Sequence, residues 1–101
     1  MEIHWRNMDE IEVTQREAVE RRLYALADGH TDLIDLRIAA KPNNHHRHGA
    51  QEVHITCQAR GKELVATRTG ADLGQALHDA VDAFVHEVRR LRDRRGDHRS
   101  A

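Results

Sequence analysis

An apolar stripe about five turns long, near the end of the chain, limits the folds open to this protein. Asp72 can cap the N-terminus of the helix, and Gln75 follows at the third helical position. The stripe recurs at spacings of three and four and consists of Leu73, Ala76, Leu77, Ala80, Val81, Phe84, Val88 and Leu91. A helix that is apolar on one side must pack on another layer, so the rest of the chain has to supply that layer.

Alternating segments predict that this layer is a β-sheet. Residues 2–6 read as a short strand, with Ile3 and Trp5 on one side. Residues 33–41 and 51–60 alternate in the same way, and residues 63–69 form a fourth strand after a tight turn at 60–62. The inward positions predicted for the second and third strands are Ile34, Leu36, Ile38, Ala40, Val53, Ile55, Cys57 and Ala59.

A second, shorter helix is predicted over about residues 14–28. Thr14 and Glu17 have the spacing of a capping box, Val13 and Ala18 that of a weak hydrophobic staple, and Gly29 is a plausible stop. The order is therefore β-α-β-β-β-α. We expect an α+β two-layer sandwich, in which two helices cover one face of a four-stranded sheet and the other face is left to solvent.

The length of 101 residues fits one domain, predicted over residues 1–96, with a short flexible tail at 97–101. The start has no apolar signal region and no stretch approaches transmembrane length, so we expect a soluble cytoplasmic protein. The single cysteine, Cys57, cannot form an internal disulfide and is predicted to be a buried structural thiol.

Charge is distributed unevenly along the chain. Residues 1–88 carry 10 basic and 15 acidic side chains, a balance of −5, whereas residues 89–101 carry 6 arginines and 2 aspartates, a balance of +4. Arg94 and Arg95 fall on the apolar stripe of the last helix, so we expect its final turns to extend beyond the sheet as a basic rod. Such asymmetry points to an interaction surface.

The arginine run exceeds what a helix C-terminus needs. One or two cations offset the helix dipole there, by about 0.3–1 kcal/mol, but five within seven residues repel one another unless an anion lies among them. Arg16, Arg21 and Arg22 form a second cluster on the first helix. If the helices lie side by side, both clusters border one groove, and phosphate backbone is the obvious partner. The low aromatic content argues against binding by base stacking.

Catalytic and metal-binding signals are weak. The sequence contains no nucleophile elbow, phosphate loop or metalloprotease motif, so we expect neither an enzyme nor a cofactor. His45, His46 and His48 lie in a loop predicted at residues 42–49. Without cysteines or paired carboxylates they lack the four ligands usual for structural zinc, and we interpret them as solvated residues, with metal sensing as a remote alternative.

The chain resembles the short ribosome hibernation-promoting factors, or ribosome-associated inhibitors, of the sigma-54 modulation protein family. The resemblance covers nearly the whole chain and rests on "RNM" after the first strand, "REAVERRLYAL" in the first helix, and "TGADLGQALHDAVDAFVHEVRRLRDR" at the end. Two positions depart from the family pattern: Ala25 stands where lysine is frequent, and Gly74 where an aromatic residue is common.

The resemblance implies a fold similar to double-stranded RNA-binding domains and docking in the messenger and transfer RNA channel of the small ribosomal subunit. Translation would be blocked by occupancy, with rRNA as the partner, no small-molecule substrate, and a monomer off the ribosome. The residues implied to face rRNA are Arg22, Arg89, Arg90, Arg92 and Arg94, and the charge pattern adds Arg16, Arg21 and Arg95. The resemblance also leads us to expect a short family member, without the extra C-terminal domain of the long ones.

One alternative remains open, and the nearest structural rival is disfavoured by its charge placement. A protein-interaction domain could use the same basic helix end to bind an acidic protein. A true double-stranded RNA-binding domain would carry its basic cluster at the start of the last helix, where this chain has the acidic-to-neutral stretch "DLGQALHDA".

Overall fold

The computed structural model describes residues 1–42 and 51–94, which form six elements in the predicted order. These elements are β1 (Glu2–Arg6), α1 (Val13–Ala27), β2 (Leu33–Pro42), β3 (Gln51–Ala59), β4 (Lys62–Gly70) and α2 (Leu73–Arg94).

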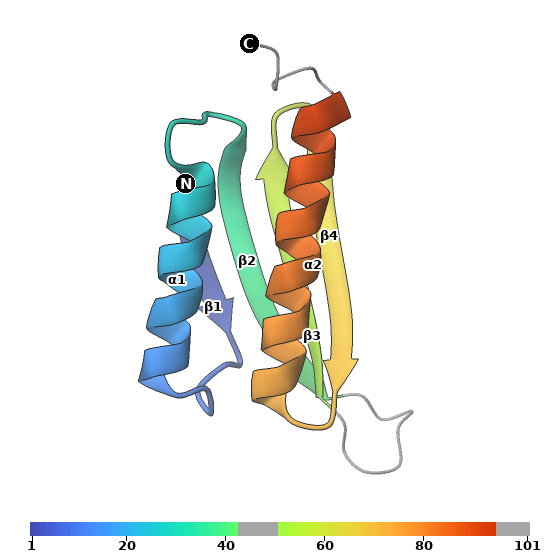
Figure 1. Cartoon of the computed structure of the whole chain (residues 1–101). Coiled ribbons are helices and arrows are strands. Elements are labelled where there is room, and N and C mark those ends of the chain that lie inside the picture. The colour runs from blue at the N-terminus through green and yellow to red at the C-terminus, as the bar shows by residue number, and fades with distance from the viewer. Residues whose placement is uncertain (43–50, 95–101) are drawn as a thin grey trace.

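The four strands of the described residues form one sheet in the order β1-β2-β3-β4. β1 pairs with β2 in parallel, and the other two pairs are antiparallel. Figure 1 shows both helices on one face of the sheet, with α1 in front of β1, α2 in front of β3 and β4, and β2 visible between the two helices. The predicted α+β two-layer sandwich is confirmed.

The core lies between α2 and the sheet. All eight residues of the predicted stripe are buried, from Leu73 to Leu91, and Phe84 is fully enclosed. Cys57 is buried on the inner face of β3, where loss of solvation raises the pKa of its thiol to about 11. The thiol is therefore protonated at neutral pH, and the prediction of a buried cysteine is confirmed.

The first helix begins differently from the prediction. The N-cap residue is Glu12, without a side-chain capping bond, so the Thr14–Glu17 capping box is wrong. Val13 is 67% exposed and cannot form the predicted staple with Ala18. A turn precedes the helix, and in it the Ile11 amide donates a hydrogen bond to the Met8 carbonyl. Buried Met8 anchors this turn, so tertiary packing rather than local capping sets the helix start. The predicted stop is supported by Gly29, whose φ of 76° is left-handed.

A β-bulge near the start of β2 reverses the predicted orientation of Ile34. Leu33 pairs with Ala59 and Asp35 with Gln58, so Ile34 has no opposite residue on β3. The extra residue shifts the alternation by one position. Leu33 is buried instead, and Ile34 is 52% exposed. The predicted inward positions from Leu36 onward are confirmed on both strands.

Gly70 ends β4 where the chain passes closest to the first turn of α2. A Cβ atom there would lie 2.9 Å from the Ala76 nitrogen and 3.2 Å from its Cα. Since both are backbone atoms, Gly70→Ala must displace the helix from the strand. We expect a loss of about 1–3 kcal/mol in the free energy of unfolding, measured by chemical denaturation.

Gly74 provides the matched control. A Cβ at Gly74 would meet only flexible side chains, the nearest atom being the Gln15 Oε1 at 3.1 Å. The substitution also gains helix propensity. Gly74→Ala should therefore change the unfolding free energy by less than about 0.5 kcal/mol. Equal losses in the two variants would contradict the close approach at Gly70.

Candidate functional site

The two helices run in the same direction, so their C-terminal halves lie at the same end of the molecule (Figure 1). There, α1 and α2 border a concave inter-helix recess of about 360 Å³. Its lining consists of Arg22, Ala25, Leu26, His30, Val85, Arg89 and Arg92. The fold thus joins Arg22 with two arginines from the run that is more than sixty residues later in the chain.

Arg92 lies at the base of the recess and is held inside the domain. Its Nε donates a hydrogen bond to the Asp32 Oδ2 at 2.7 Å, and one of its terminal nitrogens donates another to the Asp32 Oδ1 at 3.0 Å. The same terminal nitrogen donates to the Leu26 carbonyl at 3.0 Å. The two side chains are only 12% and 13% exposed. Hydrogen bonding from Arg92 lowers the pKa of Asp32, so the pair is ionised at neutral pH. Arg92 therefore acts first as a clamp between α2, the end of α1 and the start of β2.

Arg22 is paired in a more exposed setting. Its guanidinium lies 2.6 Å from the Asp82 Oδ1, and both side chains are about half exposed. Hydrogen bonding from Arg22 lowers the pKa of Asp82. An exposed pair of this kind contributes little net energy, so an incoming phosphate can take over Arg22. His78 also approaches Asp82, at 3.5 Å.

The recess carries a net positive charge despite these ion pairs. Arg22, Arg89 and Arg92 supply three positive charges, and their partners Asp32 and Asp82 supply two negative ones, which leaves +1. Arg89 has no ion-pair partner within residues 1–42 and 51–94, and His30 lies close enough to Asp32 to contribute to the lowered pKa of that carboxyl.

The other predicted arginines are placed differently. Arg21 and Arg94 are exposed near the same end, and Arg90 forms an exposed pair with Glu87 at 3.2 Å. Arg16 lies in the first turns of α1, away from the recess, with its guanidinium 4.9 Å from the centre of the Trp5 ring. Arg95 and the predicted tail lie outside the described residues. The predicted cluster on the first helix is thus divided, because Arg16 packs against β1.

The expected free basic rod is wrong for α2 up to residue 92. Leu91 is still buried, and Arg92 is bound to Asp32 and to the Leu26 carbonyl. In the described part of the helix, only the turn that ends at Arg94 lies beyond this anchor. The basic end of the helix layer, which consists of Arg21 and Arg22 of α1 and the arginines of α2 from Arg89 to Arg94, is consequently a rigid part of the domain.

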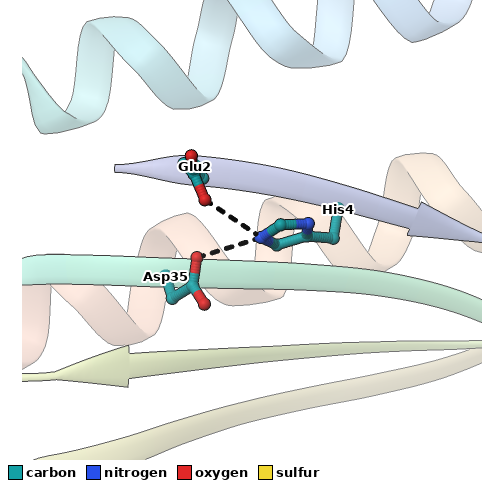
Figure 2. Close-up of side chains that lie close together, drawn as sticks. All are labelled: Glu2, His4 and Asp35. Atoms are coloured by element: carbon teal, nitrogen blue, oxygen red, sulfur yellow. Dashed lines mark hydrogen bonds and ion pairs between the residues drawn. The ribbon is translucent and has the colours of Figure 1, made fainter.

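The described residues also bring together one group of potential metal ligands, on the open face of the sheet. Figure 2 shows His4 between Glu2 and Asp35, with its Nε2 at 3.5 Å and 3.2 Å from their carboxylate oxygens. Glu2 and His4 are exposed, and three side chains fall short of the four usual for structural zinc. The hydrogen bond between His4 and Asp35 accounts for this arrangement. The predicted solvated histidines, His45, His46 and His48, lie outside the described residues.

Two residues at the recess could not be identified from the sequence. His30 follows the helix stop at Gly29, and only the parallel course of the helices brings it beside Arg89. Asp32 is sixty positions from Arg92, and no local pattern connects them. Both residues directly follow the first helix in the sequence. Because the two helices are parallel, this position lies at the same end of the molecule as the arginines of α2.

Comparison with known proteins identifies the family. Residues 1–96 match the family described as Sigma 54 modulation protein / S30EA ribosomal protein. The chain belongs to this family. The resemblance inferred from the sequence is therefore confirmed, and the protein is a member of a group of ribosome-associated modulation factors. None of the curated proteins is a significant match to the sequence.

Solved structures support the fold of this S30EA family member. A ribosomal subunit interface protein from Coxiella burnetii is 16% identical, with a TM-score of 0.64 over 96% of this chain and 99% of that one. The N-terminal domain of Thermus thermophilus Protein Y is 21% identical, with a TM-score of 0.66 over 91% of this chain and 98% of that one. Neither helix of the described ranges is long and apolar enough to cross a membrane.

Proposed function

We propose that this protein binds the small ribosomal subunit in the messenger and transfer RNA channel and blocks translation by occupying it. The basic end of the helix layer makes the contacts, directed at the phosphate backbone of rRNA. Arg89 and Arg94 contact phosphates, Arg21 and Arg90 add charge around them, and Arg22 exchanges Asp82 for a phosphate. The protein acts in the cytoplasm as a monomer that docks on idle subunits.

The observation that carries this proposal is the inter-helix recess, where Arg22 of the first cluster meets Arg89 and Arg92 of the second. Membership in a ribosome-associated family makes the ribosome the natural source of a polyanionic surface. α2 is also polarised along its length, because Asp72 and Asp79 lie at its start and its arginines lie in the last turns. An RNA wall would attract one end of the layer and repel the other, which orients the domain.

The test is co-sedimentation of the wild-type protein with purified small subunits through a sucrose gradient at two salt concentrations. The logarithm of the association constant should fall with the logarithm of salt, with a slope of about −0.7 to −0.9 for each phosphate neutralised. The three contacts made by Arg22, Arg89 and Arg94 predict a decrease of about 20- to 40-fold between 50 and 200 mM salt. Subunits preloaded with messenger and initiator transfer RNA should bind less protein. Salt-independent binding, or retention of an acidic protein partner after nuclease treatment, would contradict the proposal.

A further inference from the structure

The inter-helix recess contains a titratable side chain among its arginines. His30 is exposed at the mouth of the recess, in the short connection from α1 to β2. Its position is fixed by the turn that ends α1, in which the His30 amide donates to the Ala27 carbonyl at 3.0 Å and Gly29 adopts its left-handed φ. The imidazole is therefore presented from an ordered turn.

The size of residue 25 leaves the space beside His30 open. Ala25 lines the recess between Arg22 and His30, and it has no side chain beyond Cβ to fill that space or to supply a charge. The walls that face the imidazole are Arg22 from α1, Asp32 from the connection, and Arg89 and Arg92 from α2. Asp32 is already bound by both nitrogens of Arg92, which leaves Arg89 as the cation without a carboxylate partner among the described residues.

We propose that the inter-helix recess holds one phosphodiester group of RNA and that His30, when protonated, supplies a cationic contact to it. This inference rests on the proposed function and adds regulation to it. Histidine side chains change charge near pH 6.5. Protonation of His30 raises the net charge of the recess from +1 to +2, so binding to the small subunit strengthens as the pH falls. By linkage, a bound phosphate favours the protonated imidazole to the same extent.

The size of the effect follows from the ion-release relation for nucleic acids. At about 0.1 M salt, one additional phosphate contact increases the association constant about eightfold. His78 acts in the same direction, because its protonated form competes with Arg22 for Asp82. Since the sequence contains nine histidines, the contribution of His30 has to be isolated by comparing variants at each pH.

The experiment measures binding of the full-length protein to small subunits at about pH 8 and about pH 6. The wild type should bind more tightly at the lower pH, and His30→Gln should lose up to about eightfold of that gain. His30→Arg, with a permanent charge, should bind more tightly than the wild type at the higher pH and gain less on acidification. His86→Gln is the matched control, because His86 is exposed on α2 beside Arg68, outside the recess. It should retain the wild-type pH dependence. Identical gains for the wild type and His30→Gln would overturn the inference while leaving the proposed function intact.

A second measurement makes the inference independent of ribosome binding. Sulfate keeps its charge between these pH values, and it can be titrated into the ¹⁵N-labelled protein while the imidazole resonances are followed. Sulfate should shift the His30 resonances together with the Arg89 amide, and it should do so at lower sulfate concentrations at about pH 6 than at about pH 8. If the protein fails to bind subunits at any pH but this shift occurs, the proposed function fails and the anion site stands. If sulfate shifts neither the His30 resonances nor the Arg89 amide, the recess does not bind an anion.

Discussion

Replacing both Arg89 and Arg94 by glutamate should weaken binding to the small subunit about 60-fold or more at about 0.1 M salt. Each arginine–phosphate pair is worth about eightfold under these conditions, and the variant removes two of them. The salt slope should decrease by about one unit for each phosphate that is no longer neutralised. Both side chains are exposed, so the fold should be unaffected. Gradient co-sedimentation at several salt concentrations measures both quantities.

The matched control carries the same charge change on the opposite side of the molecule. Arg6 on β1 and Arg37 on β2 are exposed on the sheet face that no helix covers. The variant Arg6→Glu with Arg37→Glu should retain most of the binding. Equal losses in the two variants would mean that net charge, rather than the basic end of the helix layer, determines binding.

Arg92→Ala should reduce the free energy of unfolding by about 2–3 kcal/mol. The substitution leaves the Asp32 carboxylate and the Leu26 carbonyl without their donor in a nearly buried setting. In a domain of this size, such a loss lowers the melting temperature by about 10–20 °C. Arg94→Ala, which removes an exposed arginine from the same turn, should stay within about 0.5 kcal/mol of the wild type. Thermal and denaturant unfolding measure both variants.

Acid should reduce the difference between the wild type and Arg92→Ala. The pKa of Asp32 is lowered in the folded state, so the pair contributes fully above the ordinary aspartate pKa of about 4. The contribution is lost as the pH falls through the lowered folded pKa.

If Arg92→Ala does not fold, Asp32→Asn removes the ion pair while keeping an acceptor and should show a smaller loss. Stabilities equal to that of Arg94→Ala would exclude the clamp.

Most of the fold could be predicted from local patterns. The α2 stripe identifies its buried face, and the predicted cap is confirmed by the Gln75 amide, which donates to the Asp72 Oδ1 at 2.8 Å. The alternation from Leu36 to Ala40 and from Val53 to Ala59 identifies the inner face of the sheet. Each of these features depends on residues fewer than five positions apart, which is the range over which side-chain period and capping act.

The features that escaped prediction depend on distant parts of the chain. The bulge that exposes Ile34 is determined by pairing with β3, and the start of α1 by the insertion of Met8 into the core. For the basic end, the sequence indicated the two arginine clusters and their common direction. It could not distinguish Arg92, which is used inside the domain, from Arg89 and Arg94, which are left exposed, because that difference depends on Asp32.

Three separate contacts join the helices or their flanking segments along their length. At one end the Gln15 side chain donates to the Gly74 carbonyl at 3.0 Å, in the middle Arg22 meets Asp82, and at the other end Arg92 binds the Leu26 carbonyl. If a ligand removes Arg22 from the middle contact, the outer two still maintain the spacing of the helices. In the proposed complex, the domain would therefore keep this helix spacing, and little conformational entropy would be lost on association.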